Sequence, residues 1–146
     1  MIMITVKLSD VSRLRSFLNT DRAWADYALG DLEPELFPHT DWYGAEEQGD
    51  LSAVAMIYHG LQPPICFLMG DERGVDLILA QAVRLSEIGL SVRDEHLSVL
   101  DKYYRDNGTW PMCLIYGHCM RLAAAMRFRQ KRLRAVCSAA YDRLGN

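Results

Sequence analysis

Residues 51–70 read LSAVAMIYHGLQPPICFLMG, and this stretch decides the fold class. In the first nine residues both alternating sets of side chains are largely apolar, which is typical of a strand buried on both faces of a sheet. Residues 60–64 carry a Gly and two Pro and indicate a turn, and residues 65–69 form a second apolar run that stops at Gly70. The pattern predicts an antiparallel hairpin whose first strand is central in the sheet.

The segments around the hairpin predict a sheet covered by helices. Helical spacing of apolar residues predicts helices over residues 10–19, 22–29, 71–89, 94–104 and from 118 onward. Ser9 or Asp10 and then Asp21 are suitable N-caps, and Asp71 opens the third helix. Short apolar runs predict strands over residues 1–8, 90–93 and 110–116. Residues 31–50 show little periodicity and predict a structured loop with one helical turn. The expected fold is α+β, with a mostly antiparallel sheet of four to five strands and helices packed on it.

The composition predicts one globular domain over residues 1–146. Half of the 146 residues are hydrophobic and 24% are charged, which is enough apolar surface for a core. A net charge of -3 and a pI near 5.8 disfavour nucleic acid as the default partner. No apolar run approaches the length that spans a bilayer, and residues 1–8 are too short for a secretory leader. We therefore expect a cytoplasmic protein with no membrane partner.

Charge is distributed unevenly along the chain. Nine basic and 18 acidic residues precede position 117, whereas residues 117–146 hold seven basic residues and one acidic residue. The same residues have a helical apolar pattern, so we expect a basic helical tail. Such a tail binds an anion, such as a coenzyme A phosphate or nucleic acid, or it docks on the acidic body or on a second copy. The sequence leaves these alternatives open.

Several segments resemble a group of two-domain GNAT N-acetyltransferases. Residues 21–34, which read DRAWADYALGDLEP, resemble the opening of these proteins. The likeness continues in the same order with Trp42-Tyr43-Gly44, residues 55–58, the turn at Pro63-Pro64 and residues 68–70. It covers residues 10–112, and its counterpart in that group is a leading domain of about this length. The resemblance implies a degenerate GNAT-like fold of the acyl-CoA N-acyltransferase type.

The resemblance also implies where the cofactor binds in that group, which is the second domain. There a strand with a splayed backbone accepts the pantetheine, and an Arg/Gln-x-x-Gly-x-Gly/Ala loop leads into a helix whose amides bind the pyrophosphate. This chain contains no such loop. The most similar stretch is residues 129–137, where Lys or Arg occupies the glycine positions. Side chains of this size would keep the backbone from approaching a phosphate closely. The chain is therefore expected to be an accessory domain, non-catalytic alone, that contributes a substrate cleft or an oligomer interface.

Two other functions stay open at this point, so the chain is not assigned as an enzyme or a non-enzyme. In a minimal acetyl-CoA-dependent N-acetyltransferase, Arg129, Arg132 and Arg134 would hold the coenzyme A phosphates by charge, and the acceptor would be a small amine. In a homo-oligomerising module, the apolar stripe of the tail helix would form the contact. The expected partner is a GNAT catalytic domain or a second copy of this chain.

Two residues of the second predicted helix and one just after it are the candidates for binding a substrate. Trp24 and Tyr27 are aromatic, and Asp31 opens an acidic stretch with Glu33, Glu35, His39 and Asp41 that suits an amine or a general base. The competing interpretation is that the aromatic residues pack in the core and the acids cap a helix or face solvent. No residue pattern fixes the geometry of these groups, so no catalytic residue is assigned.

Histidines and cysteines provide no clear site. His59 and His96 are of a type that titrates near neutrality, but a structural role fits each of them as well. Cys66 and Cys113 lie in apolar runs, as buried cysteines do. The spacing of Cys113, His118, Cys119 and Cys137 matches no common zinc pattern, so no metal site is expected.

Overall fold

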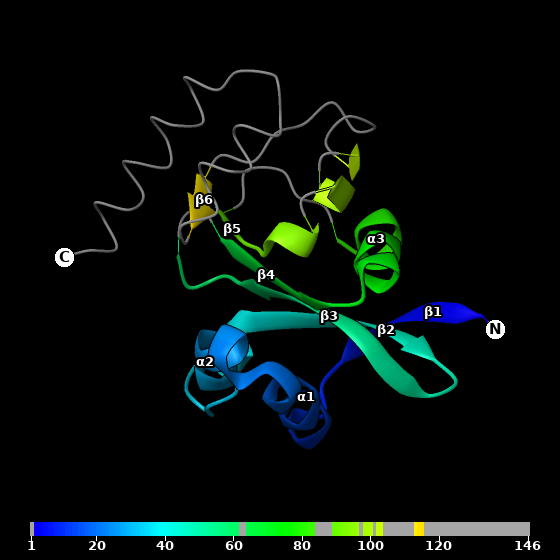
Figure 1. Ribbon diagram of the computed structural model, residues 1–146. Helices are drawn as coiled ribbons and strands as arrows, with labels where there is room; N and C mark the ends of the chain where they lie inside the picture. Colours follow the sequence, from blue (N-terminus) through cyan, green and yellow to red (C-terminus); the bar gives the residue numbers. More distant parts are fainter. Residues whose placement is uncertain are drawn as a thin grey trace.

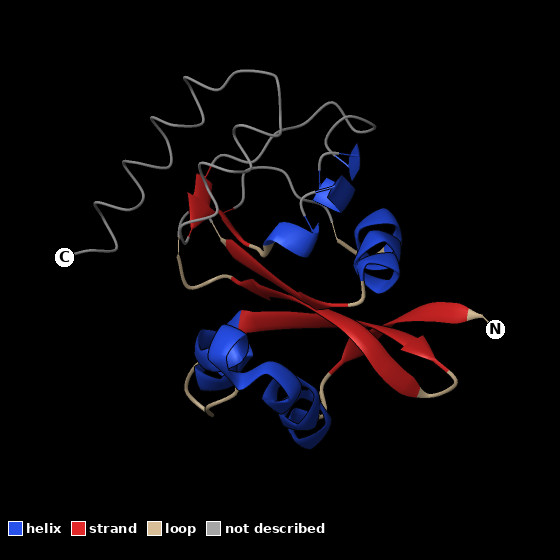
Figure 2. Cartoon of the chain, in the orientation of Figure 1, coloured by secondary structure: helices blue, strands red, loops and turns tan. Residues whose placement is uncertain are grey.

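A twisted sheet separates two layers of helices in the computed structural model, which describes residues 2–61, 64–83, 89–96, 98–100, 102–103 and 113–115 (Figure 1). The elements in chain order are β1 (Met3–Leu8), α1 (Val11–Leu18), η1 (Asn19–Asp21), α2 (Arg22–Gly30), η2 (Phe37–His39), β2 (Thr40–Glu47), β3 (Asp50–Tyr58), β4 (Ile65–Gly70), α3 (Glu72–Gln81), β5 (Gly89–Ser91), η3 (Asp94–His96) and β6 (Cys113–Ile115). Residues 98–100 and 102–103 are also helical. The two helical layers are distinct in Figure 2, with α1 and α2 on one face and α3 on the other.

The sheet has the strand order β1-β2-β3-β4-β5-β6. Strands β1 to β4 are antiparallel neighbours, whereas β5 runs parallel to β4 and β6 runs parallel to β5. The α+β class, the mostly antiparallel sheet and the β3–β4 hairpin are confirmed. The expected number of four to five strands is wrong, because the described residues form six.

The missing strand is β2, which the sequence pattern predicts as a loop. It lies between β1 and β3, and Trp42 on it is 1% exposed. A Cβ on Gly44 would lie 2.6 Å from Leu51 Cδ2 and 2.7 Å from Leu8 Cδ1, so glycine lets the side chains of both neighbouring strands meet. Gln48 and Gly49 link β2 to β3 with φ values of 55° and 86°, as a tight hairpin turn requires. The expected helical turn is present as η2.

Aspartates begin the three longer helices, as the sequence predicts. Asp10, Asp21 and Asp71 each accept a hydrogen bond from a main-chain N–H of the first turn that follows. The predicted end of α3 near Gly89 is wrong, because the helix ends at Gln81. The Val83 N–H donates to Ile78 O at 3.2 Å, which closes the helix C-terminus, and the Val83 side chain turns into the core.

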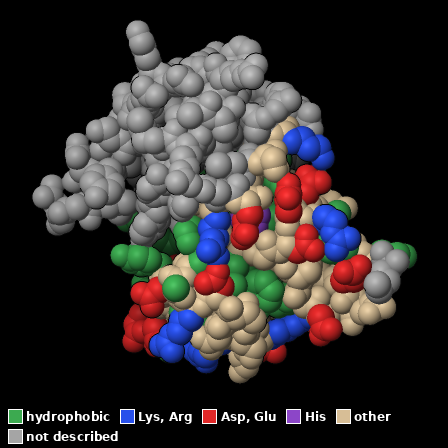
Figure 3. Space-filling view, viewed as in Figure 1, with side chains coloured by type: hydrophobic (Ala, Val, Ile, Leu, Met, Phe, Trp, Pro, Cys, Tyr) green, Lys and Arg blue, Asp and Glu red, His purple; other side chains and the backbone are tan. Residues whose placement is uncertain are grey.

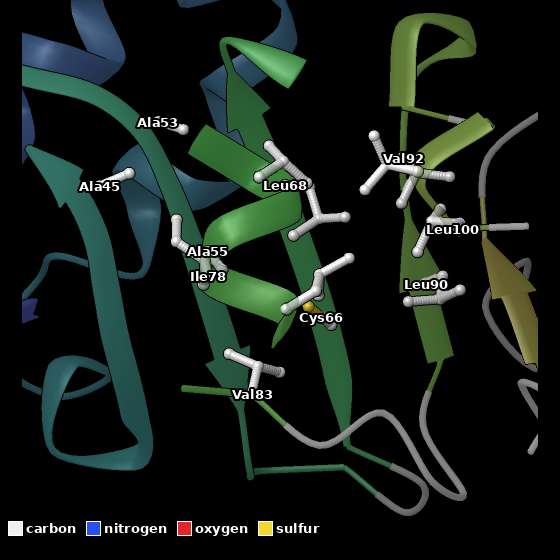
Figure 4. Close-up of a cluster of buried hydrophobic side chains, with 13 residues drawn as sticks. Ala45, Ala53, Ala55, Cys66, Leu68, Ile78, Val83, Leu90, Val92 and Leu100 are labelled. Atoms are coloured by element: carbon white, nitrogen blue, oxygen red, sulfur yellow. The ribbon is translucent and has the colours of Figure 1, made fainter. Parts of the chain in front are cut away.

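Each face of the sheet supports its own core. Under α1 and α2 the buried side chains centre on Trp42 and include Leu14, Leu18, Ala25, Ala28, Val54, Phe67 and Met69. Under α3 the buried side chains are smaller and include Ala45, Ala53, Ala55, Cys66, Leu68, Ile78 and Leu90, several of which are labelled in Figure 4. Successive residues of β4 therefore alternate between the two cores, as a central strand does.

Candidate functional site

The β4–β5 junction, meaning residues 68–70 and 92–96, is the place where the regular sheet ladder ends. β4 pairs with β5 only through Ile65–Gly89, Cys66–Leu90 and Phe67–Ser91. Beyond these pairs β4 continues to Gly70 alongside β3, while the chain after β5 turns into η3. Residues 68 and 70 point their carbonyls to the same side of the strand, so they need hydrogen-bond donors from outside the ladder.

Trp24 of α2 supplies the first donor. Its Nε1–H donates to Leu68 O at 3.1 Å, and its ring stacks on Phe67 with centroids 5.7 Å apart. The Arg93 guanidinium lies 5.3 Å from the centre of the Trp24 ring and pairs with Asp21 at the start of α2. Arg93, which follows β5, is thus attached to the α1–α2 layer through Asp21 and Trp24. Trp24 acts here as a packed connector between α2, β4 and residue 93.

His96 of η3 supplies the second donor. Its side chain is 0% exposed, and Nε2 lies 2.8 Å from Gly70 O. Because a carbonyl oxygen only accepts, this geometry assigns a proton to Nε2. No group within the described ranges hydrogen-bonds to Nδ1. His96 therefore connects the segment after β5 to the end of β4 and is the one buried polar side chain of the described residues.

The start of α3, which directly follows β4, is occupied by acidic side chains. The Asp71 carboxylate accepts from Arg73 N–H at 2.9 Å, and this hydrogen bond and the Arg73 side chain hold the pKa of Asp71 below its usual value. Glu72 adds a second carboxylate in the first turn. Carboxylates near a helix N-terminus use the positive end of the helix dipole, and here they stand where an anionic ligand would otherwise bind.

The two glycines of this connection serve packing. Gly70 has a φ of 112°, and a Cβ there would lie 2.4 Å from Ser52 O. A Cβ on Gly74 would lie 2.7 Å from the Cβ of Ala53. Gly70, at the end of β4, lies against the main chain of β3, and Gly74 is small because the first turn of α3 lies directly on β3. The sequence Gly70-Asp71-Glu72-Arg73-Gly74 thus connects strand and helix at close range.

The three predicted substrate residues have different environments. Trp24 faces β4, whereas the Tyr27 side chain is 71% exposed on the same helix. Asp31 follows the last turn of α2 and is half-buried, and this burial raises the pKa of Asp31 to about 6. A carboxylate at a helix C-terminus is also unfavourably placed in the helix dipole. Trp24 and Tyr27 lie on α2 and Asp31 directly after it, but the environment of Trp24 is that of a packed side chain.

The acidic stretch after Asp31 does not remain one cluster. Glu33 and Glu35 are exposed, whereas Asp41 lies on β2. The Asp41 carboxylate contacts His59 Nε2 at 2.7 Å and Lys7 Nζ at 3.3 Å. Burial acts to raise the pKa of Asp41, but the hydrogen bonds from His59 and Lys7 outweigh it and lower the pKa. His59 is therefore a surface partner of Asp41, as its structural interpretation predicts.

A shallow groove separates α3 from the following helical residues. Two contacts cross it: Ser98 Oγ donates to Glu72 Oε1 at 2.7 Å, and Lys102 Nζ lies 3.4 Å from Asp76 Oδ2. On the face in Figure 3, Lys and Arg side chains are interspersed with Asp and Glu over the described residues. These two contacts attach the helical residues after η3 to α3, and the groove is lined by two acidic and two basic side chains.

Several residues that the sequence analysis singles out lie outside the described part of the chain. Arg129, Arg132 and Arg134, His118, and the apolar stripe of the tail lie outside the described residues. Cys66 is buried, and the loss of water around the thiol raises the pKa of Cys66 to about 12, so it is unreactive. Within the described ranges no three His, Cys, Asp or Glu side chains are placed to bind a metal ion. Arg93 was missed at the sequence level, since nothing local marks its contact with α2.

Comparison with known proteins adds one distant likeness. No family model and no curated protein matches the chain. A crystal structure described as a predicted acetyltransferase with acetyl-CoA from Clostridium acetobutylicum aligns with 75% of this chain and 90% of that chain, at 14% identity and a TM-score of 0.36. A TM-score of this size does not establish a common fold. No described helix is long and apolar enough to cross a membrane.

Proposed function

We propose that this chain is a non-catalytic accessory domain related to GNAT acetyltransferases, which contributes a substrate cleft or an oligomer interface to a catalytic partner. The observation that carries the proposal is the state of the β4–β5 junction. In the family that the sequence resembles, the splayed strand that accepts the pantetheine of acetyl-CoA lies in the second domain, and this chain resembles the leading one. Here the carbonyls of Leu68 and Gly70 already accept from Trp24 Nε1 and His96 Nε2.

The free-energy cost of breaking the hydrogen bonds to the Leu68 and Gly70 carbonyls supports the proposal. A ligand that binds along the free side of β4 must replace two intramolecular hydrogen bonds, each of which contributes about 1 kcal/mol net. It must also leave the buried His96 without its acceptor, which costs about 1–3 kcal/mol. The sum is roughly 3–5 kcal/mol, or about a hundredfold to several thousandfold in affinity. Asp71 and Glu72 oppose a diphosphate at the start of α3 in addition.

Isothermal titration calorimetry of the full chain with acetyl-CoA tests the proposal. We expect no saturable heat at ligand concentrations up to about 1 mM, where a GNAT catalytic domain serves as the positive control. Saturable binding with a dissociation constant near 1 µM would overturn the accessory function.

The competing acyltransferase function makes an opposite prediction for the same chain. It requires acetyl-CoA turnover with a small amine, and that turnover must fall in Arg129→Ala/Arg132→Ala. Turnover of the unmodified chain at the level of buffer alone supports the accessory function. Turnover that disappears in the double variant supports the minimal acetyltransferase and contradicts our proposal.

A further inference from the structure

The β1 strand is an open edge of the sheet. It is the first strand in the sheet order, it pairs with β2 on one side, and no described strand lies on its other side (Figure 1). An edge strand carries main-chain N–H and C=O groups on alternate residues that can pair with another strand. Proteins usually protect such an edge with a proline, a bulge or a charge that points outward.

The β1 strand has no proline and no bulge, and its one charge is paired with a neighbouring strand. Residues 3–8 contain no proline, and the one register shift of the antiparallel strands lies between Ala45 and Glu46 in the β2–β3 pairing. Lys7 is the single charged residue of the strand; its side chain is 67% exposed, and its charge is paired with Asp41 of β2. Lys7 Nζ lies 3.3 Å from Asp41 Oδ1 and 5.8 Å from the centre of the Tyr43 ring, and both partners belong to β2.

The edge is also apolar on one face. Ile2, Ile4, Val6 and Leu8 alternate with the other residues and share the face that α1 and α2 cover. Leu8 is 7% exposed, but Ile4 is 50% exposed and Ile2 is 83% exposed, because the helix layer does not extend over them. Two of the four large hydrophobic side chains that are exposed in the described part of the chain therefore lie at this edge.

We propose that a second copy of this chain pairs with this edge, β1 against β1, in an antiparallel register centred on Thr5. In this register Thr5 faces Thr5 of the other copy, Ile4 faces Val6, and Ile2 faces Leu8. Cross-strand pairs of β-branched residues and of threonines are favourable. The arrangement is two-fold symmetric, so each copy covers the exposed isoleucines of the other.

Charge favours this register over a parallel one. With Thr5 at the symmetry axis, the two Lys7 residues lie four positions apart along the strands, or about 14 Å, which exceeds the screening length of about 8 Å at physiological salt. A parallel pairing would bring the two Lys7 side chains together as neighbours. The inference concerns the edge alone and does not depend on the proposed function.

Sedimentation velocity over a range of protein concentrations tests the proposal. We expect the full chain to dimerise, and Ile4→Lys to raise the dimer dissociation constant by about tenfold or more, because it replaces an apolar contact with a charge. Leu61→Lys is the matched control: Leu61 is 43% exposed in the loop after β3, and we expect no change in dimerisation. Circular dichroism must show that both variants are folded.

Disulfide cross-linking tests the register. Residues directly opposite in an antiparallel pair have Cα atoms about 4.5–5.5 Å apart, which suits a disulfide. We expect Thr5→Cys to form a dimer under oxidised glutathione faster than the unmodified chain, whereas Ile2→Cys does not, since its copies lie about 20 Å apart. A monomer at all concentrations, a dimer that Ile4→Lys leaves unchanged, or equal cross-linking of both cysteine variants would overturn the proposal.

Discussion

The antiparallel strands and the β4–β5 junction are stabilised in different ways. β2 and β3 share eight residue pairs, and β1–β2 and β3–β4 share six each, all above well-filled cores. β4 and β5 share three pairs, and beyond them the contact depends on Trp24, Arg93 and His96. The antiparallel region depends on main-chain pairing and on buried cores, whereas the junction depends on three individual side chains. Single substitutions in the two regions should therefore differ in their effects on the free energy of unfolding and on hydrogen exchange.

The largest effect is expected in the antiparallel region. Trp42 is fully buried between β2 and the α1–α2 layer, so Trp42→Ala leaves a large cavity. We expect the free energy of unfolding to fall by about 4 kcal/mol in urea titrations. Leu61→Ala, in the loop after β3, is the control and should change it by less than about 0.5 kcal/mol. A small effect of Trp42→Ala would show that this core is not the main source of stability.

The next effect concerns the α3 side of the junction. His96→Leu keeps an apolar group of similar size but removes the donor to Gly70 O, so we expect a loss of about 2 kcal/mol. His96→Gln retains an N–H donor and should recover part of this loss. Hydrogen exchange should become faster at β5 before it does at β3. Equal stability of His96→Leu and the unmodified chain would contradict the role of His96.

A smaller effect is expected on the other face of the junction. Trp24→Phe keeps an aromatic ring against Phe67 but removes the Nε1–H that donates to Leu68 O, and it weakens the contact with Arg93. We expect a loss of about 1 kcal/mol in urea titrations, again with faster exchange at β5. Exchange that increases equally in β2 and β5 would mean that Trp24 supports the whole sheet.

The smallest effect has the opposite sign. The pKa of Asp31 in the folded chain is about 6, above the value of 3.8 for an exposed Asp, so the folded state binds this proton more tightly than the unfolded state. Stability is therefore lost as the pH rises from about 4 to 6. Allowing for solvent screening, we expect Asp31→Asn to gain about 1 kcal/mol at pH 7.5 and nothing at pH 4. A gain that is independent of pH would exclude the titration of Asp31 as its cause.

Local sequence signals predict the β3–β4 hairpin and the helix caps, but they do not predict β2. The hairpin over β3 and β4 and the caps Asp10, Asp21 and Asp71 follow from residues within a few positions of one another. β2 was missed because its strand character depends on pairing with both β1 and β3, and only the turn at Gln48-Gly49 marks it locally.

The contacts of the β4–β5 junction cannot be predicted from local signals, because they join residues that are distant in the sequence. Trp24 and Leu68 are 44 positions apart, Asp21 and Arg93 are 72 apart, and Gly70 and His96 are 26 apart. No periodicity or motif connects such pairs. The interpretations of Trp24 as a packed residue and His96 as a structural residue were both available from the sequence, but their shared role at β4 was not.

Nuclear magnetic resonance of the Trp24 indole and His96 imidazole N–H groups tests the central claim most directly, since both protons are assigned to carbonyls of β4. The account predicts that the two signals exchange slowly with solvent and keep their positions when acetyl-CoA is added to about 1 mM. Saturable shifts of both signals, with faster exchange, would show that the ligand takes the Leu68 and Gly70 carbonyls and would contradict the account.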